Sequence, residues 1–91
     1  MNLEFHDRFQ QYLAAQKLPY SPLRKRVVEA VCQMEHKFTA NAVLTRIRKT
    51  AGPNVSRATL YRTLHLLVLA SMMTVTPARE DEEQIFLKDG I

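Results

Sequence analysis

Apolar residues recur along the first two-thirds of the chain at the spacing of α-helices. In the segment 2–17 they form one stripe, at steps of four, three and one: Phe5, Phe9, Tyr12 and Leu13. Pro19 disfavours a helical conformation at the residue before it, so this helix is expected to end near Leu18. Ser21 is then the predicted N-cap of a second helix, with Pro22 at its first position, where a missing N–H costs nothing.

Three further helices show the same periodicity. The second helix has an apolar face made of Leu23, Val27, Ala30, Val31 and Met34. The segment "HKFT" ends it, and Thr39 is the predicted N-cap of a third helix with an apolar face made of Ala40, Val43, Leu44, Ile47 and Ala51. After the turn "AGPN", Ser56 is the predicted N-cap of a fourth helix over 56–71, with an apolar face made of Leu60, Leu64, Leu67, Val68 and Ser71.

The period changes after residue 71. "MMTVT" and "QIFLK" are typical of short strands, and "PAREDEE" between them predicts a hairpin. About four helices followed by a two-stranded hairpin, with a short turn before the last helix, indicate a mainly α fold of the winged helix-turn-helix type. We expect one such domain over residues 1–91, because a chain of 91 residues has little room for a second core.

The fourth helix also carries polar and aromatic side chains beside its apolar face. Arg57, Tyr61 and His65 form a row at i, i+4 and i+8, and Arg62 lies one step further round. These four residues are either an ordinary solvated face or a surface that contacts a ligand. Because Tyr61 and Arg62 lie off the apolar stripe, we expect that truncating either one leaves the fold intact.

Charge is distributed unevenly along the chain. Residues 1–77 contain eleven Lys and Arg against four Asp and Glu, a balance of +7, and residues 78–91 contain two against five, a balance of −3; the sum is the formal net charge of +4. The basic part can face a polyanion, whereas the acidic end should avoid one. Arg24, Lys25 and Arg26 crowd the first turn of the second helix, where the helix dipole disfavours cations. They are either held there by a binding role or form a solvated basic cluster.

Other classes of protein find little support in the sequence. There is no run of about eighteen apolar residues and no signal-peptide segment, so neither a membrane span nor export is indicated. The single Cys32 excludes an internal disulfide and suits a reducing cytoplasm, where we expect the protein to act. The three histidines lie on different segments, and two glycines provide little material for a phosphate-binding loop, so we expect no catalytic residues.

Three segments of the chain resemble the DNA-binding domain of the ferric uptake regulator family: "YSPLRKRVVEAV", "HKFTANAVLTRIRK" and "NVSRATLYRTLHLLVLASMM". The family typically reads T-P-Q-R before helix two, H-L-S-A before helix three and S-x-A-T-V-Y-R-x-L-x-x-L in the recognition helix. Ser21, Pro22 and Arg24 match the first pattern, and Thr39 and Ala40 match part of the second. The third pattern is matched by Ser56, Ala58, Thr59, Tyr61, Arg62, Leu64 and Leu67.

The resemblance implies a repressor-type transcriptional regulator that binds double-stranded DNA sequence-specifically, with the recognition helix 56–71 in the major groove. Tyr61 would approach a thymine methyl or base edge, and Arg62 would hold a phosphate or a base. Arg24 would contact phosphate from the start of the second helix. The chemistry of these side chains suits such roles, because a phenol ring fits a thymine methyl and a guanidinium fork fits phosphate or guanine.

Four further residues of the recognition helix enter the predicted DNA-binding surface. Ser56 and Thr59 lie near an exposed helix N-terminus and could add hydrogen bonds to phosphate. Arg57 occupies the variable position of the motif and is our candidate for direct base reading. His65 is included in the predicted DNA-binding surface, and the alternative interpretation is that it is an ordinary solvated histidine.

The chain departs from the family at the positions that hold metal. Family members continue into an α/β dimerisation domain with histidine-rich metal sites, and we expect this domain to be absent because the chain stops about where it would begin. Within the present span, one family ligand position is Lys37, with His36 one residue early, and another is Leu87. We therefore expect no metal site on this chain, and zinc or iron only with the missing domain. Ser71 also stands where a glycine usually ends the recognition helix.

The predicted wing is acidic at its tip, where four carboxylates are offset by Arg79 alone: Glu80, Asp81, Glu82 and Glu83. This tip either hangs clear of DNA, meets a basic partner or is simply solvated. The alternative function is therefore a protein-interaction winged helix, an antagonist or scaffold that does not bind DNA. Under the leading hypothesis we expect a homodimer, formed on the DNA or through the missing domain, because a lone winged helix buries a modest area.

Overall fold

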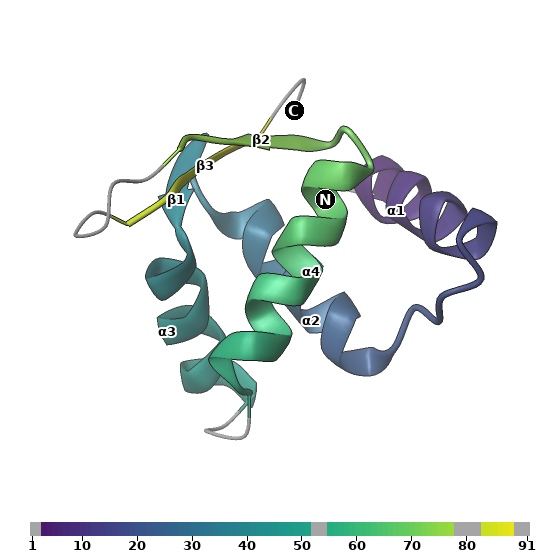
Figure 1. Cartoon of the computed structure of the whole chain (residues 1–91). Helices are drawn as coiled ribbons and strands as arrows, with labels where there is room; N and C mark the ends of the chain where they lie inside the picture. The colour runs from purple at the N-terminus through teal and green to yellow at the C-terminus, as the bar shows by residue number, and fades with distance from the viewer. Residues whose placement is uncertain (1–2, 52–54, 78–82, 89–91) are drawn as a thin grey trace.

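The computed structural model describes residues 3–51, 55–77 and 83–88, which form four helices and a three-stranded antiparallel sheet (Figure 1). The helices are α1 (Leu3–Ala15), α2 (Pro22–Gln33), α3 (Ala40–Ala51) and α4 (Arg57–Leu69). The strands are β1 (Lys37–Thr39), β2 (Met73–Val75) and β3 (Ile85–Lys88), in the order β1-β3-β2. The predicted mainly α winged helix-turn-helix fold is confirmed. Most of the predicted turn at 51–54 and the predicted wing tip at 80–82 lie outside the described residues.

The three predicted N-caps are present. Ser21, Thr39 and Ser56 each accept a hydrogen bond, through the side-chain oxygen, from the backbone N–H three residues later, at 3.3, 3.2 and 3.1 Å. Each cap satisfies one of the backbone donors that the first turn of a helix leaves without an intrahelical partner. Local sequence therefore fixes where α2, α3 and α4 begin.

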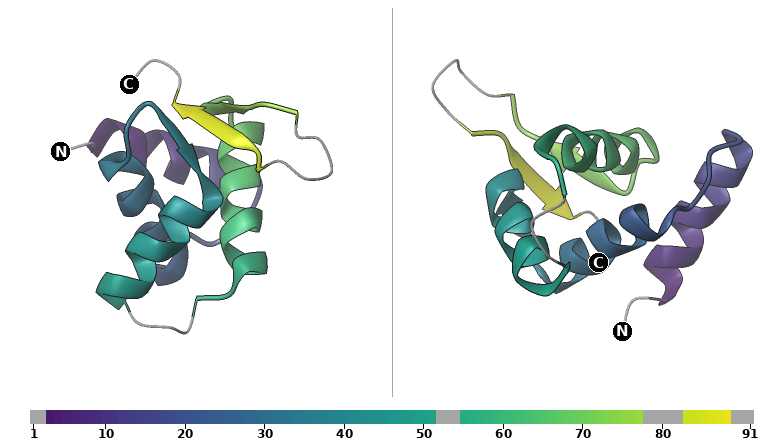
Figure 2. Two further views of the ribbon diagram at one scale, coloured as in Figure 1. Left: turned by 90° about the vertical axis from the view of Figure 1, so that its left-hand side faces the viewer. Right: turned by 90° about the horizontal axis from the view of Figure 1, so that it is seen from below.

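One hydrophobic core joins all four helices and the sheet. α1 and α3 lie on opposite sides of the α2–α4 pair, and the sheet lies across one end of the helices (Figures 1 and 2). The largest side chains with almost no exposed surface are Phe9, Leu13, Val27, Val28, Val31, Val43, Ile47, Leu60, Leu64, Leu67, Met72 and Met73. The apolar stripes predicted for the helices supply most of this core.

The sheet has a strand that the sequence did not predict. The segment "HKFT" was expected only to break a helix, but residues 37–39 form β1 and pair with β3. Phe38 is the register partner of Phe86, and their rings are stacked with centroids 5.8 Å apart. A strand of three residues is too short to show an alternating pattern, so only the partner strand reveals it. The predicted two-stranded hairpin is therefore part of a three-stranded sheet.

The connection from α1 to α2 is fixed by Tyr20. Its hydroxyl lies 2.7 Å from His6 Nδ1, and its ring meets Phe9 edge-on with centroids 5.5 Å apart. Burial, reinforced by the negative charges of Cys32 and Glu29, raises the pKa of Tyr20 well above its ordinary value. The phenol therefore stays protonated and ties α1 to the start of α2.

α1 and α4 both end with a residue in the left-handed conformation. At the end of α4, Ser71 has φ 61°, its N–H donates to Val68 O at 3.0 Å, and Met72 N–H donates to Leu67 O at 3.1 Å. This pair of bonds is a Schellman motif, with the buried Met72 and Leu67 in the usual hydrophobic positions. A side chain at this position is strained because its Cβ crowds the following carbonyl oxygen.

The end of α1 repeats this motif with Lys17, at φ 58°. Its N–H donates to Ala14 O at 3.0 Å, and Leu18 N–H donates to Leu13 O at 2.8 Å. Helix α1 therefore ends at Ala15, earlier than the position near Leu18 that Pro19 suggested. The left-handed residue, and not the proline, terminates the helix.

Lys88, the last residue of β3, is buried with 7% of its surface exposed. Its ammonium donates to the carbonyl oxygens of Val31 and Cys32, at 3.2 and 3.5 Å, and to that of Met34. These carbonyls belong to the C-terminal end of α2, where the helix dipole favours a cation. Lys88 therefore joins the sheet to α2 through a charged helix cap.

We predict that Ser71→Gly raises the free energy of unfolding by about 1 kcal/mol, because glycine adopts positive φ without steric strain. Ser71→Ala is the matched control, since alanine keeps the Cβ and should bring no gain. Urea denaturation followed by circular dichroism measures both variants. Equal stability of the two would contradict the strain at residue 71.

We predict that Lys88→Met lowers the free energy of unfolding by about 1–3 kcal/mol, because buried carbonyl oxygens lose a charged donor. Lys37→Met is the control: Lys37 is an exposed lysine of the neighbouring β1 and should change stability by less than about 0.5 kcal/mol. Thermal and urea unfolding test the pair. A Lys88→Met protein more stable than the parent would show that the desolvation cost of the ammonium outweighs its hydrogen bonds.

Candidate nucleic-acid interface

Helix α4 divides into a core side and a solvent side. Leu60, Leu64 and Leu67 have no exposed surface, as the apolar stripe predicted. Arg57, Arg62 and His65 are exposed, so three of the four residues singled out on this helix lie on its solvent side. Val68 is half-buried, and the helix ends two residues before the predicted residue 71.

Tyr61 differs from the other three residues. It is half-buried and packs against the hydrophobic core, so the expectation that its truncation leaves the fold untouched needs correction. The reason is the length of the ring, which reaches from the flank of the stripe to the core edge although its Cα lies outside the stripe. The ring therefore lies between the core and the exposed face of α4.

The start of α4 is held by hydrogen bonds on both sides. The Ser56 and Thr59 hydroxyls lie 2.8 Å apart, and Ser56 also caps the helix. Arg48 of α3 donates to Val55 O at 3.5 Å, which ties the chain entering α4 to α3. One of the two hydroxyls donates to the other, so the hydroxyl that accepts keeps its own O–H group for a further acceptor.

Arg57 contacts the other helix of the helix-turn-helix. Its Nη1 donates to Asn41 Oδ1 at 2.6 Å, and Asn41 Nδ2 donates to Glu83 Oε1 before β3. Asn41 carries no sequence signal of its own, and Glu83 is recognisable in the sequence only as part of the acidic wing tip. No local signal could have found this chain of contacts, because the residues are 16 and 42 positions apart.

Two of the cations in the first turn of α2, where the helix dipole disfavours positive charge, have partners within the chain. Arg24 is half-buried and donates from Nη1 to Pro19 O at 2.6 Å, and Lys25 Nζ lies 5.6 Å from the centroid of the Tyr20 ring. A carbonyl oxygen and an aromatic face are both neutral. The two cations are thus stabilised without being neutralised.

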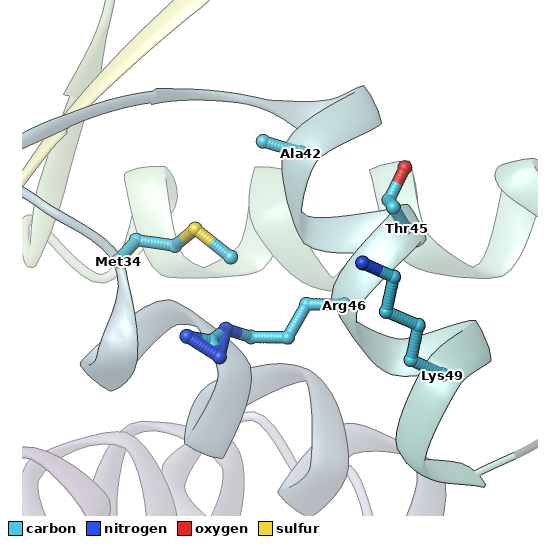
Figure 3. Close-up of a pocket in the computed structure, with 5 residues that line it drawn as sticks. All are labelled: Met34, Ala42, Thr45, Arg46 and Lys49. Atoms are coloured by element: carbon cyan, nitrogen blue, oxygen red, sulfur yellow. The ribbon is translucent and has the colours of Figure 1, made fainter.

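The helix-turn-helix is positively charged throughout. From residue 37 to residue 77 the chain has six Lys and Arg and no Asp or Glu. On the flank of α3 that faces α2, a groove of about 320 Å³ is lined by Met34, Ala42, Thr45, Arg46 and Lys49 (Figure 3). Two cations and no carboxylate line this groove, so it is positively charged.

The two family metal-ligand positions within this span lie on neighbouring strands of the sheet. Lys37 and Leu87 are direct register partners in the β1–β3 ladder, so the fold brings the two positions together while the side chains present are a lysine and a leucine. His36 is exposed, and His6 is bonded to Tyr20. Within residues 3–51, 55–77 and 83–88, no three or more His, Cys, Asp or Glu side chains are grouped as a metal site requires.

The order of elements defines a winged helix-turn-helix protein, with α3 and α4 as the helix pair and a small antiparallel sheet beside them. The chain belongs to the ferric uptake regulator family, whose family model matches residues 15–89. No protein with a curated description matches the sequence. None of the described helices is long and apolar enough to span a membrane.

Solved structures share the fold, among them two structures of PerR. One is GAS PerR-Zn-Zn, with 21% identity, a TM-score of 0.71 and coverage of 87% of this chain and 50% of the other. The other is PerR from Streptococcus pyogenes, from work on peroxide sensing and gene regulation, with 21% identity, a TM-score of 0.70 and coverage of 87% and 53%. The chain spans about half the length of each.

We predict that these 91 residues bind no regulatory transition metal tightly, because a zinc or ferrous site needs three or four converging ligands. Titration calorimetry with zinc should show no stoichiometric site of sub-micromolar affinity. Metal chelation should also leave the unfolding curve unchanged. A stoichiometric site that disappears in His36→Ala would overturn the prediction and identify that exposed histidine as a ligand.

Proposed function

We propose that this chain binds double-stranded DNA sequence-specifically, as part of a repressor-type transcriptional regulator, with α4 in the major groove. The supporting observation is that α4 presents Arg57, Arg62 and His65 to solvent on a helix-turn-helix free of carboxylates from residue 37 to residue 77. A major groove admits one α-helix, and its base edges are read by forked donors and apolar contacts. Membership of the ferric uptake regulator family supports the same function.

Each side chain of α4 has a role that fits its position. Arg57, exposed at the first residue of the helix, reads a base edge. Arg62 holds a phosphate or a base with its guanidinium fork. The half-buried Tyr61 offers a stiff ring to a thymine methyl, and His65 flanks the contact.

Contacts to phosphate position the domain and carry no sequence information. Arg24 supplies one from the start of α2, where its bond to Pro19 O leaves four of the five guanidinium N–H groups available. Ser56 and Thr59 supply others from the N-terminus of α4, whose dipole favours an anion. These contacts account for the salt-dependent part of the affinity.

The partner is a second copy bound to the neighbouring half-site. A single winged helix buries a modest area on DNA, so high affinity requires two copies spanning two half-sites. The function is binding and not catalysis. The competing function is a protein-interaction winged helix that does not bind DNA. The two functions are distinguished by whether the chain shows an affinity for DNA that falls steeply as the salt concentration rises.

We predict that Arg62→Ala weakens binding to the preferred duplex by about 1–3 kcal/mol without lowering the melting temperature, because the side chain is exposed. The duplex is selected from a random library with the unmodified chain, and affinity is measured by fluorescence anisotropy over a salt series. Tyr61→Phe accompanies it, since Tyr61→Ala would also remove core contacts.

Arg24→Ala is the matched control, because it removes the same charge from a proposed phosphate contact. It should weaken the preferred and a scrambled duplex equally and lower the salt slope by about one unit. Unaltered DNA affinity in Arg62→Ala would remove Arg62 from the interface. An unmodified chain with no salt-dependent DNA binding would favour the protein-interaction function instead.

A further inference from the structure

Asn41 links the recognition helix to the wing. Its carbonyl oxygen accepts from Arg57 Nη1 at 2.6 Å, and its amide nitrogen donates to Glu83 Oε1. Asn41 belongs to the first turn of α3, Arg57 begins α4, and Glu83 precedes β3. Three elements distant in sequence therefore meet in one chain of hydrogen bonds at the edge of the proposed DNA-binding surface.

The hydrogen bonds from Arg57 to Asn41 and from Asn41 to Glu83 allow a single orientation of the Asn41 amide. Arginine has only donors and an ionised glutamate has only acceptors, so the Asn41 oxygen must face Arg57 and its NH₂ group must face Glu83. An aspartate at this position would repel the carboxylate of Glu83, and an alanine would contact neither neighbour. Asparagine is therefore suited to this place by having a donor and an acceptor on one short rigid group.

The contact restrains the arginine while leaving it able to bind. A guanidinium has five N–H donors, and the bond to Asn41 uses one of them. A free arginine side chain loses up to about 2 kcal/mol of rotamer entropy when it is ordered, whereas one already held in place loses less on binding. Asn41 thus fixes the direction in which the remaining N–H groups of Arg57 point.

We infer that Asn41 and Glu83 are positioning residues that aim Arg57 and so set the base preference of α4. This inference rests on the proposed function. All three side chains are exposed, so the contact adds little to the stability of the fold. A carboxylate near a DNA-binding surface weakens the electrostatic attraction between that surface and phosphate. Glu83 compensates for this loss of affinity by orienting the Asn41 amide, which in turn holds Arg57.

The test compares variants by their preference for one base over another. The probe is the duplex selected from a random library with the unmodified chain, together with a set carrying each single base-pair change. Asn41→Ala should reduce the discrimination at the base pair read by Arg57 by about tenfold, within the range that a bidentate contact supplies. Its affinity for a scrambled duplex and its melting temperature should remain unchanged, because no charge and no core contact is lost.

Three further variants separate positioning from charge. Glu83→Gln keeps an acceptor for Asn41, so it should retain the base preference while strengthening binding to every duplex. Asn41→Leu keeps about the size of the side chain but offers no acceptor to Arg57, so it should change the preference as Asn41→Ala does. Arg57→Ala should abolish the preference at the same base pair, and adding Asn41→Ala to it should bring no further loss.

The outcomes distinguish this inference from the proposed function. If Arg57→Ala loses the preference while Asn41→Ala and Asn41→Leu keep it, the positioning role is wrong and DNA binding by α4 stands. If Arg57→Ala itself keeps the preference, Arg57 reads no base and the inference falls with it. If the unmodified chain selects no duplex and shows no salt-dependent binding, the proposed function fails first.

Discussion

The burial of one side of α4 is the constraint on which the rest of the structure depends. Leu60, Leu64 and Leu67 have no exposed surface, so the rotation of this helix about its axis is fixed by the hydrophobic effect. The same rotation places Arg57 and Arg62 in solvent. The surface that we assign to DNA is therefore the side of α4 opposite the core. If a different side of α4 were buried, Arg57 and Arg62 would no longer face solvent together.

The basic residues of the domain are stabilised in a way that preserves their charge. In the structure, Arg24, Lys25 and Arg57 have neutral partners: a carbonyl oxygen, a phenol ring and an amide. Neutral partners orient a cation without cancelling its field, unlike a carboxylate. Glu83 influences Arg57 through the intervening Asn41. A positively charged surface is thus compatible with ordered side chains.

The apolar stripes and the N-caps were predictable, and several features at the ends of elements were not. Ser21, Thr39 and Ser56 were identified as caps because a capping side chain bonds the backbone only three residues away. By contrast, Tyr61 was placed off the core by the angle of its Cα, which takes no account of how far a ring reaches. The left-handed Lys17 was missed because glycine, the usual signal, is absent there. At Ser71 the family resemblance did point to a glycine position, but the positive φ became evident only in the structure.

The sequence by itself determined the number of helices, where α2, α3 and α4 begin, which side of each helix is buried and how charge divides along the chain. These properties depend on residues within about four positions of one another, because that is the reach of helical periodicity and capping. Only the tertiary structure decided that β1 pairs with β3, that Lys88 caps α2 and that Asn41 joins Arg57 to Glu83. Those contacts join residues 16 to 57 positions apart, or strands too short to carry a pattern, and they form only after the core has packed the helices together.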